Sequence, residues 1–121
     1  RPDLVDKILL VGHLEDVATL YRAFDWVLIP SLDEGLGLTL QEAVLARVPV
    51  LASELAVFRE QLGDTGWYAM PNDESGWSEA IERAAQASAD TVAAAQYRAL
   101  APDEAWSSFS QVARQLISGS Q

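Results

Sequence analysis

Residues 26–53 read WVLIPSLDEGLGLTLQEAVLARVPVLAS, and this stretch decides the fold class. It begins with the apolar run Trp26–Ile29, which is ended by Pro30, and it closes with a shorter apolar run at Val50–Ala52. Between these runs apolar residues recur at helical spacing, and the helix must end before Pro49. A strand, a helix and a second strand in this order predict a βαβ unit with parallel strands.

The sequence on either side continues this alternation. Ile8–Val11 is a continuous apolar run, which predicts a strand buried on both faces, and an amphipathic helix is expected over residues 15–24. On the other side, Ser53 is a candidate N-cap for a helix over roughly 54–61. Trp67–Met70 then predicts a fourth strand. The tryptophans fall on strand or helix stripes and are expected in the core; they are Trp26, Trp67, Trp77 and Trp106.

The C-terminal third is predicted to be helical. Helices are expected near residues 77–87 and 90–100, followed by a last helix that ends near Ile117, and residues 118–121 should fray. The fold class predicted from the whole chain is therefore α/β: a Rossmann-like parallel sheet of about four strands flanked by helices. Ligands of such sheets bind beyond the carboxyl ends of the strands, which draws attention to the loops at residues 12–14 and 31–38.

Composition excludes several classes of function. The 121 residues are enough for about one domain with a single core. A formal charge of −10, from 18 acidic and 8 basic side chains, argues against a nucleic-acid surface and against general attraction to anionic membranes. There is no cysteine and one histidine, so a zinc site or a thiol nucleophile is not expected. No signal peptide or apolar run long enough to span a bilayer is evident, so a cytoplasmic protein is expected.

Two glutamates flank the glycine-rich turn between the second predicted strand and its helix. Glu42 fits a capping box with Thr39 at the N-cap, and it equally fits a ligand-binding carboxylate. Glu34 is either a solvated loop acid or a ligand-binding group. Gly35 and Gly37 allow a left-handed backbone or a close approach by a ligand, and the helix behind them offers unpaired amides to an anion. A diphosphate over the helix start with hydroxyl groups on the carboxylates would use all of these features.

These residues carry a family resemblance. The stretch quoted above resembles the signature of the retaining GT-B glycosyltransferases of family 4, the glycosyl transferases group 1, in which Pro-Ser, Glu-Gly-Phe/Leu-Gly-Leu and a second Glu precede a Pro-Val-Ile/Val-Ala-Ser strand. The segments VGHLEDVATLYRAFD, FREQLGDTGWY and WSSFS resemble flanking motifs of that family in the same order. By this resemblance, residues 1–121 are part of a C-terminal, donor-binding domain.

The resemblance implies a role for each position. Glu34 would act at the donor sugar as the catalytic residue, and Glu42 would hold the ribose hydroxyls. Backbone amides of the intervening turn would contact the sugar and the diphosphate, and a second loop would border the base. The turn comprises Gly35, Leu36, Gly37, Leu38 and Thr39, and the second loop comprises Gly12, His13 and Leu14. Such enzymes transfer a hexose from a nucleoside diphosphate sugar with retention, without a metal or another cofactor, so amides and cationic groups must stabilise the leaving diphosphate.

The sequence also departs from the family pattern. Arg47 stands in a turn where the family has glycine, and Ala56 replaces a frequent proline. The family's basic Arg and Lys pair on the diphosphate has no counterpart, because Lys7 lies elsewhere in the pattern, and the N-terminal, acceptor-binding lobe is missing. The expected partners are therefore a nucleotide sugar and the missing lobe, and the chain alone is expected to be inactive. The alternative is a non-catalytic α/β interaction module or an oligomerising fragment, possible as a homo-oligomer because a sheet edge is left open.

Overall fold

Three parallel strands form the sheet in the computed structural model, which describes residues 6–12 and 20–101. The strands are β1 (Val27–Ile29), β2 (Val50–Ser53) and β3 (Trp67–Ala69), in the spatial order β1-β2-β3. β2 pairs in parallel with both neighbours and is buried along its whole length. The α/β fold with a parallel sheet is confirmed, because continuous apolar runs are typical of strands that are covered on both faces.

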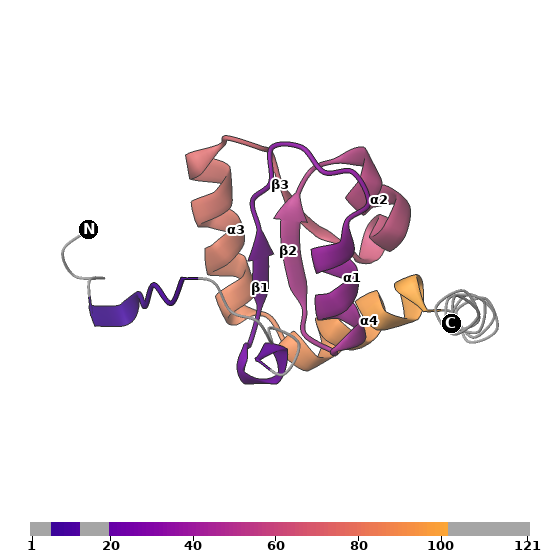
Figure 1. The fold of residues 1–121 in the computed structure, drawn as a ribbon, viewed down its shortest axis with the longest axis horizontal. Coiled ribbons are helices and arrows are strands. Elements are labelled where there is room, and N and C mark those ends of the chain that lie inside the picture. The colour runs from indigo at the N-terminus through magenta and orange to yellow at the C-terminus, as the bar shows by residue number, and fades with distance from the viewer. Residues whose placement is uncertain (1–5, 13–19, 102–121) are drawn as a thin grey trace, which may run out of the picture.

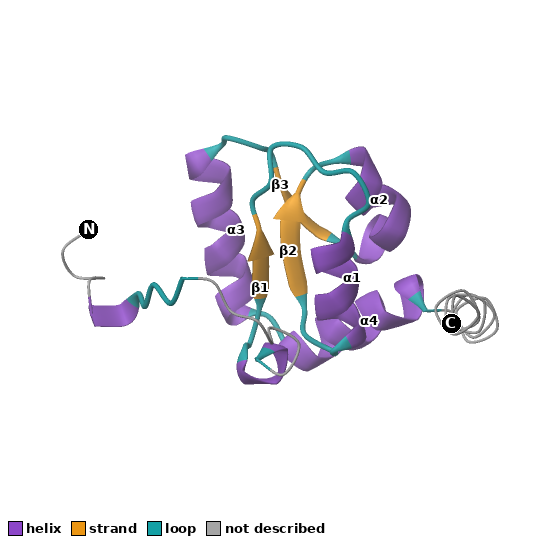
Figure 2. Cartoon of the chain, viewed as in Figure 1, coloured by secondary structure: helices purple, strands orange, loops and turns teal. Residues whose placement is uncertain are grey.

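Helices cover both faces of this sheet. They are α1 (Leu38–Leu45), α2 (Ala56–Leu62), α3 (Glu74–Gln86) and α4 (Ala89–Leu100), with short 3₁₀ turns η2 (Tyr21–Ala23) and η3 (Gly63–Thr65). α3 lies on one side of the sheet, and α1, α2 and α4 lie on the other (Figures 1 and 2). The helices predicted near 77–87 and 90–100 are confirmed as α3 and α4. Asp73 and Ser88 cap them by accepting hydrogen bonds from the Gly76 and Thr91 amides.

The sheet divides the core into two unequal parts. The larger cluster lies under α1, α2 and α4 and includes the fully buried Leu40, Val50 and Phe58. The smaller cluster, under α3, is built on Leu51, because successive residues of a strand point to opposite faces. Three of the four tryptophans, Trp26, Trp67 and Trp77, are partly buried against this smaller cluster, so they border the core instead of filling it. Trp106 lies outside the described residues.

The strand predicted at residues 8–11 is wrong. These residues form no strand and are exposed, with 84% of Leu9 and 91% of Leu10 accessible to solvent. A strand needs a neighbouring strand to satisfy its backbone hydrogen bonds. Among residues 6–12 and 20–101 the sheet consists of β1, β2 and β3, and residues 8–11 pair with none of them. An apolar run alone therefore does not form the strand.

Two other boundaries differ from expectation. The predicted helix over 15–24 falls mostly on residues outside the described part, and its described end is the 3₁₀ turn η2. Ser53 does not cap α2: it is the buried last residue of β2, its hydroxyl donates to the Ile29 carbonyl at 3.3 Å, and Leu55 occupies the N-cap position. The strand continues one residue further than expected, and Ser53 pairs with Ala69 of β3. The last predicted helix, near 103–117, also lies outside the described residues.

A buried glutamine of α4 completes the sheet at the start of β2. Gln96 is fully buried, and its side-chain amide accepts from the Val50 N–H at 2.8 Å and donates to the Val50 carbonyl at 3.0 Å. It also donates to the Thr65 carbonyl at 3.3 Å. The amide thus supplies an acceptor to the Val50 N–H and a donor to carbonyls of β2 and η3. This pairing ties α4 to the sheet.

The turn before β2 contains Arg47, which stands where the family resembled by the sequence has glycine. Arg47 has a φ of 65°, the left-handed conformation that glycine adopts without strain. Its guanidinium lies 4.1 Å from the centre of the Tyr97 ring in α4. A left-handed non-glycine residue costs about 1–2 kcal/mol, and a cation–π contact offsets part of that cost. The turn therefore keeps the geometry of a glycine turn with arginine in place.

Candidate functional site

The predicted site lies at the carboxyl end of β1. The loop that joins β1 to α1 crosses the end of the sheet toward which the strands point (Figure 1). Within this loop Glu34 is half-buried, and its backbone N–H donates to the Asp33 carboxylate at 2.9 Å. The loop is in the position where parallel α/β sheets bind ligands.

Gly37 turns the loop into the helix. It occupies the N-cap position of α1 in the left-handed conformation, with φ 67° and ψ 38°. The first helical hydrogen bond runs from the Gln41 N–H to the Gly37 carbonyl, so the N–H groups of Leu38, Thr39 and Leu40 have no partner within the helix. Unpaired amides at the positive end of a helix dipole favour an anion.

The capping box predicted for this helix is wrong. Because the left-handed Gly37 starts the helix, Thr39 is its second residue and Glu42 its fifth, and no side chain caps the start. A capping box requires the acidic residue three positions after the N-cap. Glu42 is therefore not engaged in capping, and the alternative, a role in binding, remains for it.

Glu42 is held instead by a tyrosine that precedes β1. The Tyr21 hydroxyl donates to Oε2 of Glu42 at 3.2 Å. The Tyr21 ring is buried and Glu42 is exposed. Burial, and secondly the Glu42 charge and this hydrogen bond, raise the pKa of Tyr21, so its hydroxyl stays protonated and acts as a donor. Tyr21 falls within the segment 15–24 that is predicted as an amphipathic helix. This contact is not predicted, because the spacing of apolar residues does not show where a tyrosine hydroxyl points.

Two glutamines meet on the loop between the glycines. The Leu36 carbonyl accepts from Nε2 of Gln41 at 3.1 Å and from Nε2 of Gln61 at 3.0 Å. Gln41 lies in α1, and Gln61 reaches the loop from α2. Neither residue is predicted from the sequence. No local sequence pattern indicates the Gln61 contact, because its two partners are 25 positions apart along the chain.

The remaining predicted residues of the turn are accessible. Gly35 is exposed, its φ is not left-handed, and a Cβ added there would meet nothing within 4 Å. Leu36 and Leu38 are 71% and 55% exposed, and Thr39 is exposed as well. The fold itself therefore does not require glycine at position 35, whereas it does at Gly37.

The loop predicted to border the base is not brought to this site. Gly12 has a φ of 70° and is exposed, and residues 6–12 lie on the far side of α3 from the β1–α1 loop in Figure 1. His13 and Leu14 lie outside the described residues. The roles of these three residues therefore stay predictions.

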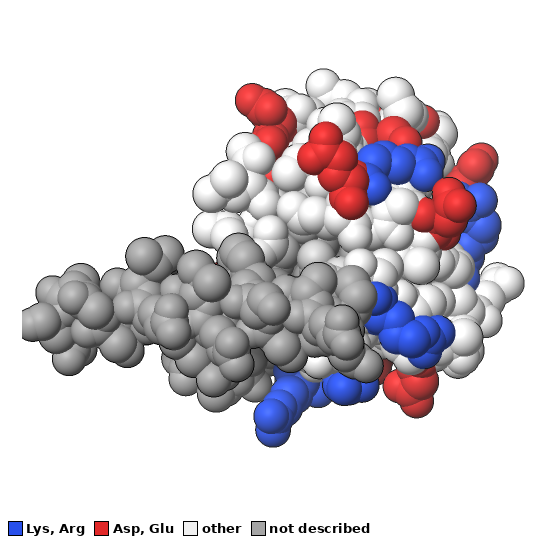
Figure 3. All heavy atoms as spheres, turned by 90° about the vertical axis from the view of Figure 1, so that its right-hand side faces the viewer, with Lys and Arg blue, Asp and Glu red and all other residues white. Residues whose placement is uncertain are grey.

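The charges near the site are mainly acidic. On the face formed by α1, α2 and α4, basic and acidic side chains are interspersed, and acidic ones gather toward the end of the molecule where the loop lies (Figure 3). Arg59 of α2 forms a salt bridge with Glu54, with 2.6 Å between Nε and Oε1. Its guanidinium carbon lies 4.3 Å from the centre of the Tyr68 ring. In the part of the chain that the structure describes, no three acidic or histidine side chains are grouped to hold a metal ion. The groups of this loop that could contact an anion are thus backbone amides.

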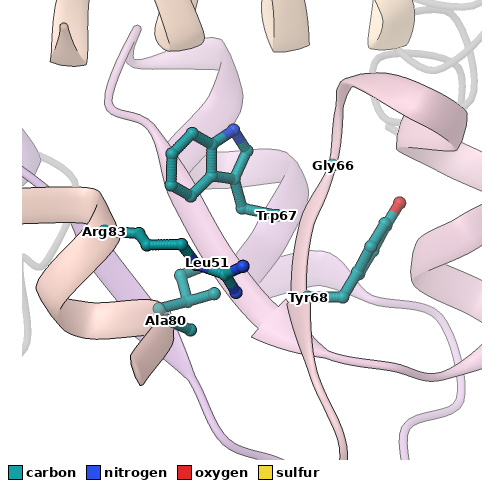
Figure 4. Close-up of a pocket in the computed structure, with 6 residues that line it drawn as sticks. All are labelled: Leu51, Gly66, Trp67, Tyr68, Ala80 and Arg83. Carbon is teal, nitrogen blue, oxygen red and sulfur yellow. The ribbon is translucent and has the colours of Figure 1, made fainter. Parts of the chain in front are cut away.

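A separate pocket of about 260 Å³ lies between β3 and α3 (Figure 4). It is lined by Leu51, Gly66, Trp67, Tyr68, Ala80 and Arg83. Trp67 and Tyr68 project to opposite sides of β3, and Arg83 extends from α3 toward Leu51. The pocket contains none of the predicted site residues and lies away from the carboxyl end of β1, so we do not assign the ligand to it.

The parallel sheet with helices on both faces and the strand-to-helix loop beyond its carboxyl end define a Rossmann-like α/β domain. The sequence matches the family described as glycosyl transferases group 1 over residues 1–87, and the chain belongs to this family.

Known relatives agree with this assignment. The chain is 33% identical over 86 residues to the O-antigen chain mannosyltransferase RfbU of Salmonella typhimurium, covering 69% of this chain and 24% of the relative. It is 35% identical over 80 residues to the lipopolysaccharide core biosynthesis mannosyltransferase LpcC of Rhizobium leguminosarum bv. viciae, covering 64% of this chain and 23% of the relative. The chain thus spans about a quarter of the length of these relatives.

A solved structure extends the similarity to the fold. Sucrose-phosphate synthase from Thermosynechococcus elongatus superimposes with a TM-score of 0.71 and 26% identity. The match covers 97% of this chain and 32% of the synthase. Within residues 6–12 and 20–101, no helix has the length and apolar character needed to cross a membrane.

Proposed function

We propose that this chain is the donor-binding part of a retaining hexosyltransferase that uses a nucleoside diphosphate sugar. The observation that carries the proposal is the β1–α1 loop, where a left-handed glycine precedes three helix amides, between Glu34 and Glu42, that have no hydrogen-bond partner among the described residues. The amides suit a diphosphate, and the two carboxylates suit sugar and ribose hydroxyls. The family assignment and the mannosyltransferase relatives support a hexose as the transferred group.

In this proposal each carboxylate has a separate part. Glu42 accepts from the ribose hydroxyls, and the Tyr21 hydroxyl fixes one of its oxygens. Glu34 faces the transferred sugar as the catalytic residue, with the Gly35, Leu36 and Gly37 amides beside the sugar. The Leu38 and Thr39 amides contact the diphosphate and stabilise the charge that develops on it when the sugar leaves, without a metal ion. We expect binding but no transfer by this chain, because it spans only about a quarter of the length of the related mannosyltransferases.

The ribose assignment can be tested by calorimetry with UDP, GDP and ADP. We expect weak binding of at least one, and a loss of about tenfold to 100-fold in Glu42→Ala, because a hydrogen bond to a charged group contributes about 1.5–3 kcal/mol. The 2′-deoxy form of the ligand should bind the wild type more weakly than the ribose form, and Glu42→Ala should bind the two forms equally. Glu42→Gln, which keeps an acceptor for Tyr21, checks that the effect is not a loss of folding.

Glu79→Ala is the matched control, since Glu79 is exposed on α3, on the other side of the sheet. It should leave binding unchanged. Unaltered affinity in Glu42→Ala would overturn the ribose assignment, and a folded wild type that binds none of the three diphosphates would overturn the proposed function.

A second candidate function, an interaction or oligomerising module, is favoured by one observation. Among the residues that the structure describes, β1 has a neighbouring strand on one side only, and a pocket of about 500 Å³ next to it is lined largely by apolar side chains. Leu28 and Ile81 in this pocket are each 43% exposed, and residues 8–11 add a further exposed apolar segment. Open edges and apolar patches of this kind promote association of chains.

We therefore expect this chain to associate at high concentration. Light scattering over a concentration series should show a rising average mass, and Leu28→Lys should reduce it, because a charge at an open edge opposes strand pairing. Leu36→Lys is the control, since Leu36 is exposed in the β1–α1 loop and not at the open edge of β1. A monomeric mass across the whole series would exclude this second function.

A further inference from the structure

We infer that Gln41 and Gln61 are positioning residues that set the direction of the backbone amides in the donor site. The inference rests on the proposed function and concerns how the loop between Glu34 and Gly37 keeps its shape. Loops between a strand and a helix usually vary in conformation, whereas anion-binding amides must be held in one orientation before the ligand arrives.

The two glutamines hold one carbonyl group from two sides. Their Nε2 atoms lie 3.1 Å and 3.0 Å from the Leu36 oxygen, so both lone pairs of this oxygen have a donor. Gln41 belongs to α1, which follows the loop, and Gln61 belongs to α2. The Leu36 side chain itself is 71% exposed, so the carbonyl and not the side chain anchors the loop.

Fixing this carbonyl also fixes the next amide. No described peptide bond is cis, and in a trans peptide the N–H points opposite to the C=O. Because the Leu36 carbonyl points at the two glutamines, the Gly37 N–H points away from them. Gly37 directly precedes Leu38 and Thr39, whose amides the proposed function assigns to the diphosphate, so the two glutamines hold the backbone from which those amides project.

The absence of a side chain at Gly37 makes the contact possible. A Cβ at this position would lie 2.9 Å from Nε2 of Gln61 and 3.3 Å from the Phe58 ring. Gln61 therefore packs directly against the glycine backbone. Gln61 must present its nitrogen to Leu36, because the reverse orientation would place two acceptor oxygens together.

This orientation leaves the other end of the Gln61 amide unsatisfied. Its Oε1 atom is buried and has no hydrogen-bond partner in the part of the chain that the structure describes. A buried acceptor without a donor costs stability, and an apolar side chain of similar size would avoid this cost. Glutamine at this position is thus explained by its donation to the loop and not by the stability of α2.

The inference predicts a loss of affinity that depends on the phosphates. Gln41→Met and Gln61→Met keep the side-chain length and remove the amide. Each should weaken binding of the nucleoside diphosphate by about threefold to tenfold, the usual effect of one hydrogen bond. Inorganic pyrophosphate should lose affinity by a similar factor. The corresponding nucleoside without phosphates should bind as it does to the wild type.

Gln86→Met is the control, since Gln86 is exposed at the end of α3. Equal diphosphate affinity in the wild type and both methionine variants would overturn this inference and leave the proposed function intact. An equal loss for nucleoside and diphosphate would also overturn it, because that result indicates a general structural effect. If the wild type binds none of the probes, the proposed function fails, and this inference fails with it.

Discussion

Gln96→Leu is expected to lower the free energy of unfolding by about 1–3 kcal/mol, because it leaves the buried N–H of Val50 without the Gln96 acceptor and removes a donor from the Val50 carbonyl. Each unsatisfied buried group costs about 1–3 kcal/mol, and the apolar side chain recovers part of this loss by burial. The Thr65 carbonyl loses a donor as well. Since these groups lie at the start of β2, the central strand, the loss should affect the whole sheet.

Urea unfolding followed by tryptophan fluorescence measures this change, because three tryptophans line the smaller core cluster. Gln86→Leu provides the comparison: Gln86 is exposed, and a surface substitution of this kind should change stability by less than about 0.5 kcal/mol. Gln96→Glu should destabilise at least as much as Gln96→Leu, since it would bury a carboxylate beside the Val50 and Thr65 carbonyl oxygens and cannot donate to them when ionised. If Gln96→Leu unfolds at the wild-type urea concentration, the side-chain pairing contributes nothing to the stability of β2.

The sequence predicted those parts of the fold that depend on local pattern. β1, β2 and β3 were found because short apolar runs bounded by Pro and Gly are typical of buried parallel strands. Ile8–Val11 has the same local pattern and forms no strand, because a strand also needs a neighbour in the sheet. The sequence contains no local sign of whether that neighbour is present.

The site shows the same division. Glu34, Gly37 and Glu42 stand in one short segment, so their spacing around a strand-to-helix loop could be read from the sequence. Tyr21 and Gln61 reach that segment from positions 21 and 25 residues away from their partners. Their contacts arise from packing of the helices on the sheet, which residue patterns do not specify. The start of α1 was misplaced for a related reason: Thr39 is a good capping residue, but the left-handed Gly37 begins the helix before it.

Alanine substitutions at Gly35 and Gly37 distinguish an effect on folding from an effect on binding. Gly37→Ala is expected to lower the free energy of unfolding by about 1–3 kcal/mol, because alanine is strained at a φ of 67° and its Cβ would displace Gln61. Gly35→Ala should leave stability unchanged or raise it by up to about 1 kcal/mol, because its backbone is not left-handed and its Cβ meets no atom within 4 Å. Thermal or urea unfolding of the two variants gives this comparison directly.

Binding should show a different pattern. If the ligand lies against the loop backbone, a Cβ at either glycine would obstruct it, and we expect both variants to lose at least about tenfold in affinity for the nucleoside diphosphate hexose. For Gly35→Ala this loss would occur in a chain of undiminished stability, which a purely structural role of the glycine cannot explain. A Gly35→Ala variant that is stable and binds the nucleotide sugar like the wild type would place the ligand away from this turn. The backbone amides at the start of α1 would then have to contact the diphosphate from the side on which Thr39 lies.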